Sequence, residues 1–183
     1  MKGNWNRILR VELGSGKVDD LTVPEEVWRD LIGGSGVGAW LFLKHAGHLP
    51  DPLAPDNPLI IMGGPIVGTT LPGSSRFAIC ARSPQTGIWG EGTCGGNFGP
   101  MLKSCGIDGL YITGKAAAPA YLCVEDAKVT VHEAADLWGK DTYETGDILE
   151  KRHDEKRARV ICIGPAGERL VKYANINNDH GDV

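Results

Sequence analysis

The sequence predicts an α+β fold of two similar halves with mixed or antiparallel sheets. Strand-like runs come in pairs joined by tight turns, which favours antiparallel pairing over a doubly wound parallel sheet. A succession of strand, turn, strand and helix occurs twice, in RVELGSGKVDDLTVPEEVW (10–28) and in CVEDAKVTVHEAADLWGKD (123–141). The repetition favours one domain over residues 1–183 that arose by duplication of about 1–98 and 99–183. The alternative is that two such units look alike by chance.

The first half opens with a hairpin and two helices. Residues 7–13 alternate as a strand does, and 18–23 continue extended after the turn GSGK. Pro24 starts a helix with two glutamates in its first turn, where negative charge is favourable, and Gly33-Gly34 end it. The other elements expected in this half are a helix over about 37–46, a loop over 47–57, strands over 57–64, 76–83 and 88–93, and a short helix from Pro100 to Gly106.

The second half is predicted to have more strand than helix. Asp141 and Glu144 form a capping-box pattern, which predicts a helix from there to about residue 153. The other expected elements are a strand over 108–115, a hairpin over 120–126 and 128–134, a buried strand over 158–164, and an extended run over 169–177.

Charge and hydropathy narrow the function classes. Lysine and arginine total 19, aspartate and glutamate total 23, and the net charge is −4. No basic run occurs, which argues against nucleic-acid binding. The start of the chain has no apolar core of signal-peptide length, and the longest apolar stretches are too short to cross a bilayer. We therefore expect a cytoplasmic protein with no nucleic-acid or membrane partner.

The sequence shows no self-contained catalytic or metal site. Five cysteines, Cys80, Cys94, Cys105, Cys123 and Cys162, are dispersed without a C-x-x-C pair. This spacing matches neither a zinc site nor an iron–sulfur site, and we expect free thiols. The five histidines have no metal-site spacing, and no nucleophile elbow is present. No catalytic residue is therefore assigned in this chain.

Glycine is the unusual part of the composition. There are 26 glycines, about twice the typical share, concentrated in clusters at 33–38, 63–65, 90–96 and 164–167. The first cluster follows a predicted helix, whereas a dinucleotide fingerprint follows a strand, so a helix end is the better interpretation.

The third cluster, GEGTCGG (90–96), has features of a ligand site. Glycine allows the backbone to approach a ligand closely, and exposed N–H groups can hold phosphate or a flat heterocycle. Arg76 supplies a planar five-donor fork suited to phosphate. From the residues alone, strand bends and a surface salt bridge explain these features equally well.

The chain resembles the N-terminal domain of the tungsten-containing aldehyde:ferredoxin oxidoreductases. The resemblance starts at Gly3 and continues to the last residue, with the family's landmarks in order. They are GNWNRILRVEL (3–13), LIGGSGVGAW (31–40), DPLAPDNPLI (51–60), SSR (74–76), RSPQTG (82–87), GGNFGPMLKSCGIDGLYITGK (95–115), LWGKDTYET (137–145), IGPAGE (163–168) and NNDHG (177–181).

The resemblance implies two halves related by a pseudo-twofold axis and a role as platform for a tungsten (or molybdenum) bis-pyranopterin. The parent enzyme would oxidise aldehydes to carboxylic acids and pass electrons through a [4Fe–4S] cluster to ferredoxin. The cluster ligands belong to later domains, so this chain is expected to be a piece of a longer enzyme and inactive alone. A homodimer is compatible with the resemblance. A reductase of other substrates such as aromatic thioesters, and a stand-alone non-enzymatic pterin-binding module, stay open as alternatives.

The resemblance also implies site residues. Arg76 would lie between pterin and cluster, and Thr93 and Gly95 would contact the pterin and its phosphates. Thr93 and Val183 would help to hold a magnesium ion between the phosphates. The full cofactor-binding set is Arg76, Thr93, Cys94, Gly95, Gly96, Asp182 and Val183.

Two positions depart from the family pattern. Thr93 stands where the family typically has Asn, and a hydroxyl reaches less far toward magnesium than an amide carbonyl. Asp182 stands where the family often has Arg, and an acid beside phosphate is unfavourable unless a cation intervenes.

Overall fold

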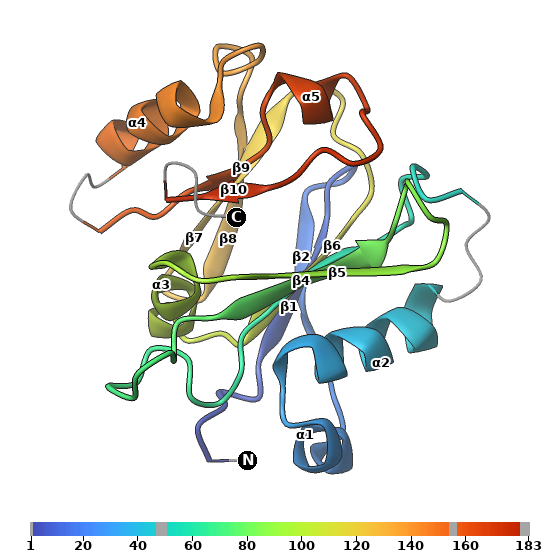
Figure 1. The fold of residues 1–183 in the computed structure, drawn as a ribbon, viewed down its shortest axis with the longest axis vertical. Coiled ribbons are helices and arrows are strands. Elements are labelled where there is room, and N and C mark those ends of the chain that lie inside the picture. Colours follow the sequence, from blue (N-terminus) through green and yellow to red (C-terminus); the bar gives the residue numbers. More distant parts are fainter. Residues whose placement is uncertain (1, 47–50, 154–156, 180–183) are drawn as a thin grey trace.

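A six-stranded mixed sheet forms the centre of the protein (Figure 1). The computed structural model describes residues 2–46, 51–153 and 157–179. The strand order is β2-β1-β6-β3-β4-β5, in which β1 and β6 run parallel and all other neighbours are antiparallel. Its strands are β1 (Ile8–Glu12), β2 (Lys17–Leu21), β3 (Leu59–Met62), β4 (Phe77–Arg82), β5 (Trp89–Cys94) and β6 (Gly109–Thr113).

Helices and two small strand pairs complete the architecture. The helices are α1 (Glu25–Leu31), α2 (Gly34–Ala46), α3 (Phe98–Ser104), α4 (Thr142–Arg152) and α5 (Pro165–Glu168). The strand pairs are the hairpin β7 (Ala120–Glu125) with β8 (Lys128–Glu133), and β9 (Ile161–Cys162) with β10 (Asn177–Asn178). The predicted α+β class with a mixed sheet is confirmed.

Alternation along the central strands gives the sheet two apolar faces. Ile60 and Met62 of β3 point into one core, and Ile61 between them points into the other. The first core lies under α1 and α2 and contains fully buried Trp28 and Leu41. Burying both faces explains why β3 and β6 read as nearly continuous apolar runs.

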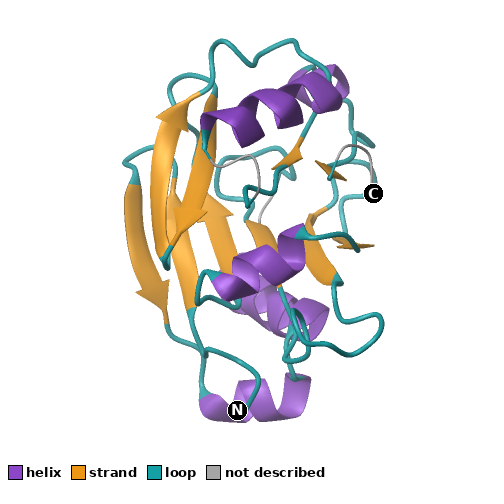
Figure 2. Ribbon diagram, turned by 90° about the vertical axis from the view of Figure 1, so that its left-hand side faces the viewer, coloured by secondary structure: helices purple, strands orange, loops and turns teal. Residues whose placement is uncertain are grey.

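The second face is covered by α3 and by the β7–β8 hairpin, which Figure 2 shows rising beside the sheet. A groove of about 1000 Å³ separates these layers. It is lined by apolar side chains from the sheet, α3, the hairpin and β9, among them Ile61, Leu102, Leu122 and Ile161. A smaller core joins α4 to the segment after β8 through Leu137 and Leu149.

The first two glycine clusters pack against each other. Ile32 ends α1 with a φ of 69°, and Gly33 follows with a φ of 153°. The Gly34 N–H donates to the Gly63 carbonyl at 2.9 Å. An added Cβ on Gly33 would lie 3.1 Å from the same oxygen, so glycine is required by this close approach. The predicted helix end is confirmed, although α2 begins at Gly34 and not at residue 37.

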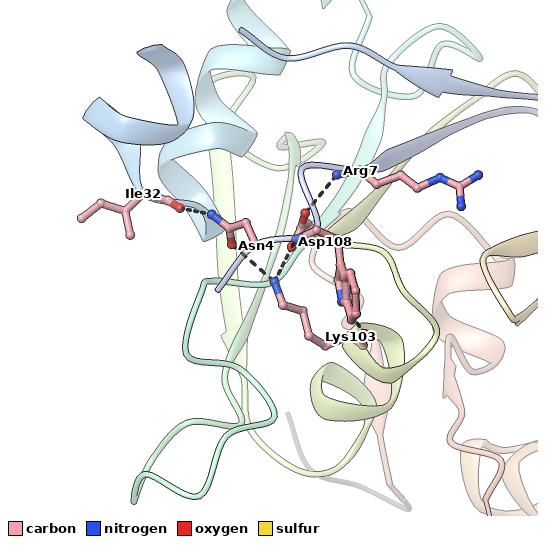
Figure 3. Close-up of polar contacts among 6 residues, drawn as sticks. Asn4, Arg7, Ile32, Lys103 and Asp108 are labelled. Carbon is pink, nitrogen blue, oxygen red and sulfur yellow. Dashed lines mark hydrogen bonds and ion pairs between the residues drawn. The ribbon is translucent and has the colours of Figure 1, made fainter. Parts of the chain in front are cut away.

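The N-terminal segment is tied to the sheet by Asp108, which is 1% exposed. Its carboxylate accepts the N–H groups of Trp5 at 3.1 Å and Arg7 at 3.0 Å. Figure 3 shows the Lys103 ammonium between the Asn4 and Asp108 side chains. Asn4 also donates to the Ile32 carbonyl, so one polar network joins the chain start, α1 and α3. The close packing of these groups marks it as structural.

Two predictions for the second half are wrong in extent. The buried strand expected over 158–164 is reduced to the half-buried pair Ile161–Cys162, and Pro165 starts α5 directly after it. The extended run expected over 169–177 contains turns, with a φ of 58° at Leu170.

A hairpin followed by a helix does occur in both halves. The pseudo-twofold axis and the duplication boundaries stay predictions.

Candidate functional site

The candidate site lies where β5 turns into α3. The strand expected over 88–93 is confirmed as β5, which takes in most of the third glycine cluster, and Cys94 at its end pairs with Phe77 of β4. The turn proper begins at Gly95, and Gly96 takes a φ of 71°. Asn97 then precedes α3, which begins at Phe98 and not at Pro100.

Arg76 lies beside this turn. It directly precedes Phe77, whose partner across the sheet is Cys94, so the β4–β5 pairing brings Arg76 to the Gly95 end of β5. A Cβ added to Gly95 would lie 3.9 Å from the Ser75 hydroxyl, which confirms how close the two segments are. The Arg76 side chain is exposed, and within the described residues its guanidinium has no ion pair or hydrogen bond. It is therefore available to a ligand.

The other predicted site residues divide into three groups. Thr93 is exposed at the end of β5, and its backbone pairs with Ala78. Cys94 is 7% exposed and packs into the second core, so its thiol faces the interior. Asp182 and Val183 lie outside the described residues.

Two residues that sequence reasoning did not assign hold the turn. Asn178 is 1% exposed, and its Nδ2 donates to the Gly95 carbonyl at 2.9 Å. The Asp179 carboxylate accepts the Asn97 N–H at 2.5 Å. Both belong to the NNDHG landmark, which was the available signal, although nothing in the sequence paired it with a turn more than 80 residues earlier.

Four of the five thiols have a raised pKa. All five cysteines are free. Burial and, to a smaller extent, the nearby Glu91 carboxylate raise the pKa of the Cys80 thiol to about 12. Burial also raises the pKa values of Cys105, Cys123 and Cys162. A raised thiol pKa lowers nucleophilicity and metal affinity at neutral pH.

The described residues hold no group of three or more His, Cys, Asp or Glu side chains placed to bind a metal ion. What the site offers is an unpaired guanidinium, the hydroxyl of Thr93 and the backbone of a glycine turn. This donor set fits a ligand rich in acceptor atoms, such as a phosphate or a polar heterocycle.

The family model of the aldehyde ferredoxin oxidoreductase N-terminal domain matches residues 8–183. The chain belongs to this family. The tungsten-containing aldehyde ferredoxin oxidoreductase of Pyrococcus furiosus is 38% identical over 179 residues, covering 98% of this chain and 30% of the relative. The enzyme of the same name from Thermococcus kodakarensis is 40% identical with the same coverage. The chain thus spans less than a third of the length of these relatives.

A solved structure supports the fold of this aldehyde ferredoxin oxidoreductase domain. The active-site complex BamBC of benzoyl coenzyme A reductase, bound to 1,5-dienoyl-CoA, superimposes with a TM-score of 0.94 at 31% identity. The match covers 99% of this chain and 28% of that one. In the part of the chain that the structure describes, no helix has the length and apolar character needed to cross a membrane.

Proposed function

We propose that the complete enzyme carrying this chain oxidises aldehydes to carboxylic acids, with ferredoxin as electron acceptor. Aldehyde and water give acid, two protons and two electrons. A tungsten (or molybdenum) bis-pyranopterin, when bound, supplies the redox chemistry, and a [4Fe–4S] cluster held by later domains carries the electrons onward. The observation that carries this proposal is the 38–40% identity to two tungsten-containing aldehyde ferredoxin oxidoreductases across 98% of the chain.

This chain binds and orients the cofactor in the proposal. Arg76 donates to the pterin or its phosphates from the start of β4, and Thr93, Gly95 and Gly96 line the adjacent turn. The exposed guanidinium supports this role, since its planar five-donor fork is free to bind a phosphate with two parallel hydrogen bonds. Cys94 contributes through the backbone, because its thiol is buried in the core.

A magnesium ion between the cofactor phosphates belongs to the same proposal. Thr93 and Val183 would supply its protein oxygens, and the remaining ligands would be phosphate oxygens and water. Thr93 supplies no carboxylate, so the phosphates would provide most of the negative charge that balances the magnesium ion. Asp182 would be tolerated beside the phosphates because the cation intervenes. A cytoplasmic location and a homodimer are also part of the proposal.

One alternative has specific support. The BamBC match indicates that the same platform serves an enzyme named as a benzoyl coenzyme A reductase, so reduction of an aromatic thioester is the second candidate. The identity is lower, 31% against 38–40%, which favours aldehyde oxidation.

The test uses the complete enzyme, produced in cells supplied with tungstate and molybdate. Tungsten, molybdenum and iron per polypeptide are measured, together with dye reduction by a series of aldehydes and oxidation of reduced dye by benzoyl-CoA. Stoichiometric tungsten with aldehyde oxidation supports the first proposal, and thioester reduction alone supports the second. Absence of metal and of both activities would indicate a non-enzymatic module. The 183-residue chain is the control, expected to hold no iron and to oxidise no aldehyde.

A further inference from the structure

The Asn178–Asp179 pair clasps the turn between β5 and α3 from the interior side. Asn178 Nδ2 lies 2.9 Å from the Gly95 oxygen and 3.6 Å from the Cys94 sulfur, and Asp179 Oδ2 lies 2.5 Å from the Asn97 nitrogen. Asn178 is 1% exposed, so water does not compete for its hydrogen bond. Cys94, Gly95 and Asn97 are thereby fixed to Asn178 of β10 and to Asp179 after it, and Gly96 lies between the fixed residues.

The bond to Gly95 also determines where the next N–H points. In a trans peptide the C=O and the following N–H point in opposite directions, and the chain has no cis peptide among its described residues. Because the Gly95 carbonyl points at Asn178, the Gly96 N–H points away from it. That N–H donates to no described residue. The turn therefore presents one unused donor on the side opposite the clasp.

The clasp is not optimised for stability alone. The Oδ1 atoms of Asn178 and Asp179 are buried and have no hydrogen-bond partner among the described residues. A buried polar atom without a hydrogen-bond partner lowers the free energy of unfolding by about 1–3 kcal/mol. Apolar side chains at these two positions would therefore stabilise the fold more than the polar ones do. The geometry of the turn is what these two polar residues secure.

We propose that Asn178 and Asp179 are positioning residues that aim the Gly96 N–H at an acceptor atom of the pyranopterin cofactor. This inference rests on the proposed function. Arg76 lies beside the same turn, so guanidinium and N–H would converge on one ligand. Neither Asn178 nor Asp179 touches the ligand itself; they act through the backbone that they hold.

The chemistry of each side chain suggests a discriminating variant. Asn178→Asp keeps the shape but replaces the donor by an oxygen, which would repel the Gly95 carbonyl. Asp179→Asn keeps an acceptor for the Asn97 N–H. Gly96→Ala would place a Cβ 2.5 Å from Asn178 Nδ2 and 2.6 Å from Asp179 Oδ2, at a φ of 71°, and so displaces the turn without burying a charge. Gly92→Ala is the matched control, because a Cβ there meets nothing within 4 Å.

The experiment measures tungsten and pterin per folded polypeptide in the complete enzyme, and amide hydrogen exchange of a peptide containing residues 94–97 in enzyme prepared without cofactor. We expect Asn178→Asp and Gly96→Ala to hold at least about tenfold less cofactor at limiting supply and to exchange faster in that peptide. Gly92→Ala should match the wild type in both readouts, and Asp179→Asn, which keeps the acceptor for the Asn97 N–H, should match it in hydrogen exchange of the 94–97 peptide.

Wild-type cofactor content in folded Gly96→Ala and Asn178→Asp enzymes would overturn the inference. If Asn178→Asp does not fold, Gly96→Ala decides. The hydrogen-exchange readout separates this inference from the proposed function: a wild-type enzyme without tungsten contradicts the proposed function, whereas unchanged exchange at 94–97 in the two disruptive variants contradicts the clasp.

Discussion

Lys103 and Asp108 form an ion pair inside the protein, with side chains 10% and 0% exposed. The pair joins the end of α3 to the start of β6. The same carboxylate holds the N–H groups of Trp5 and Arg7, so its charge is compensated from three sides. Such a network is stable only while all its members are present.

Lys103→Met should lower the free energy of unfolding by about 3–5 kcal/mol, because it leaves the Asp108 charge buried with backbone partners alone. Urea unfolding followed by circular dichroism measures the change. Adding Asp108→Asn to Lys103→Met should recover part of the loss, since the unpaired charge is then gone. A loss below about 1 kcal/mol in the single variant would contradict the role assigned to the pair.

Gly109→Ala should prevent correct assembly of the central sheet. A Cβ at this position would lie 2.3 Å from the Ile61 carbonyl oxygen and 2.3 Å from the Met62 sulfur, so the backbones of β3 and β6 would have to separate. We expect destabilisation of at least about 3 kcal/mol or loss of soluble protein. Gly92→Ala on β5, where space is open, serves as control and should unfold at the wild-type urea concentration.

Asp141→Ala should destabilise α4 by about 0.5–2 kcal/mol. The Asp141 carboxylate accepts the Glu144 N–H at 2.8 Å, which satisfies one of the free donors at the helix start. Asp141→Ser retains an acceptor and should restore most of the loss. Equal stability of the alanine and serine variants would show that the cap contributes nothing.

Cys80 should make stability fall at alkaline pH. In the folded protein the pKa of the Cys80 thiol is raised from 9.0 to about 12. The thiol of the unfolded chain therefore ionises first as the pH rises. The contribution of Cys80 to the free energy of unfolding is complete below pH 9 and is lost as the pH rises toward 12. The loss is at most about 4 kcal/mol. Urea unfolding at pH 8, 9 and 10 compares wild type with Cys80→Ala, whose curve should be flatter. Parallel curves would disprove this assignment.

Arg76→Ala should lower aldehyde oxidation by the complete enzyme about 30-fold or more, in line with about 2–5 kcal/mol for a lost charged partner in a buried site. Arg76→Lys keeps the charge without the planar fork, so its rate of aldehyde oxidation should lie between those of the wild type and of Arg76→Ala. Arg29→Ala is the control, since Arg29 is an exposed arginine paired with Asp30 on α1. Full activity of the Arg76→Ala enzyme would contradict its proposed role.

Local signals predicted the elements of the first half well. The Pro24 helix start, the alternating strand at 7–13 and the apolar runs of β3 and β4 all appear where periodicity and helix-start signals placed them. The hairpin β7–β8 was also predicted, and its two-residue turn has positive φ at both Asp126 and Ala127, as this hairpin type requires.

Non-local relations could not be predicted in the same way. The strand expected over 158–164 pairs only at Ile161–Cys162, because a strand extends only as far as its partner does. The clasp of Asn178 on Gly95 depends on the packing of β10 beside the end of β5, which no local pattern encodes. Arg76 and the glycine cluster were singled out separately in the sequence, and their adjacency follows only from the β4–β5 register.

The parallel pairing of β1 with β6 has a consequence for biosynthesis. Ile8 pairs with Gly109, so the partner strands are about 100 residues apart and β6 separates β1 from β3 in the sheet. During translation the β1–β2 hairpin and the β3–β5 strands cannot join into one sheet until β6, which ends at Thr113, has emerged from the ribosome. At typical elongation rates this interval lasts roughly 5–20 s. The edge of β1 that β6 will cover is open for the whole interval, and that of β3 from the time of its own synthesis, which makes the nascent chain a candidate client of ribosome-associated chaperones.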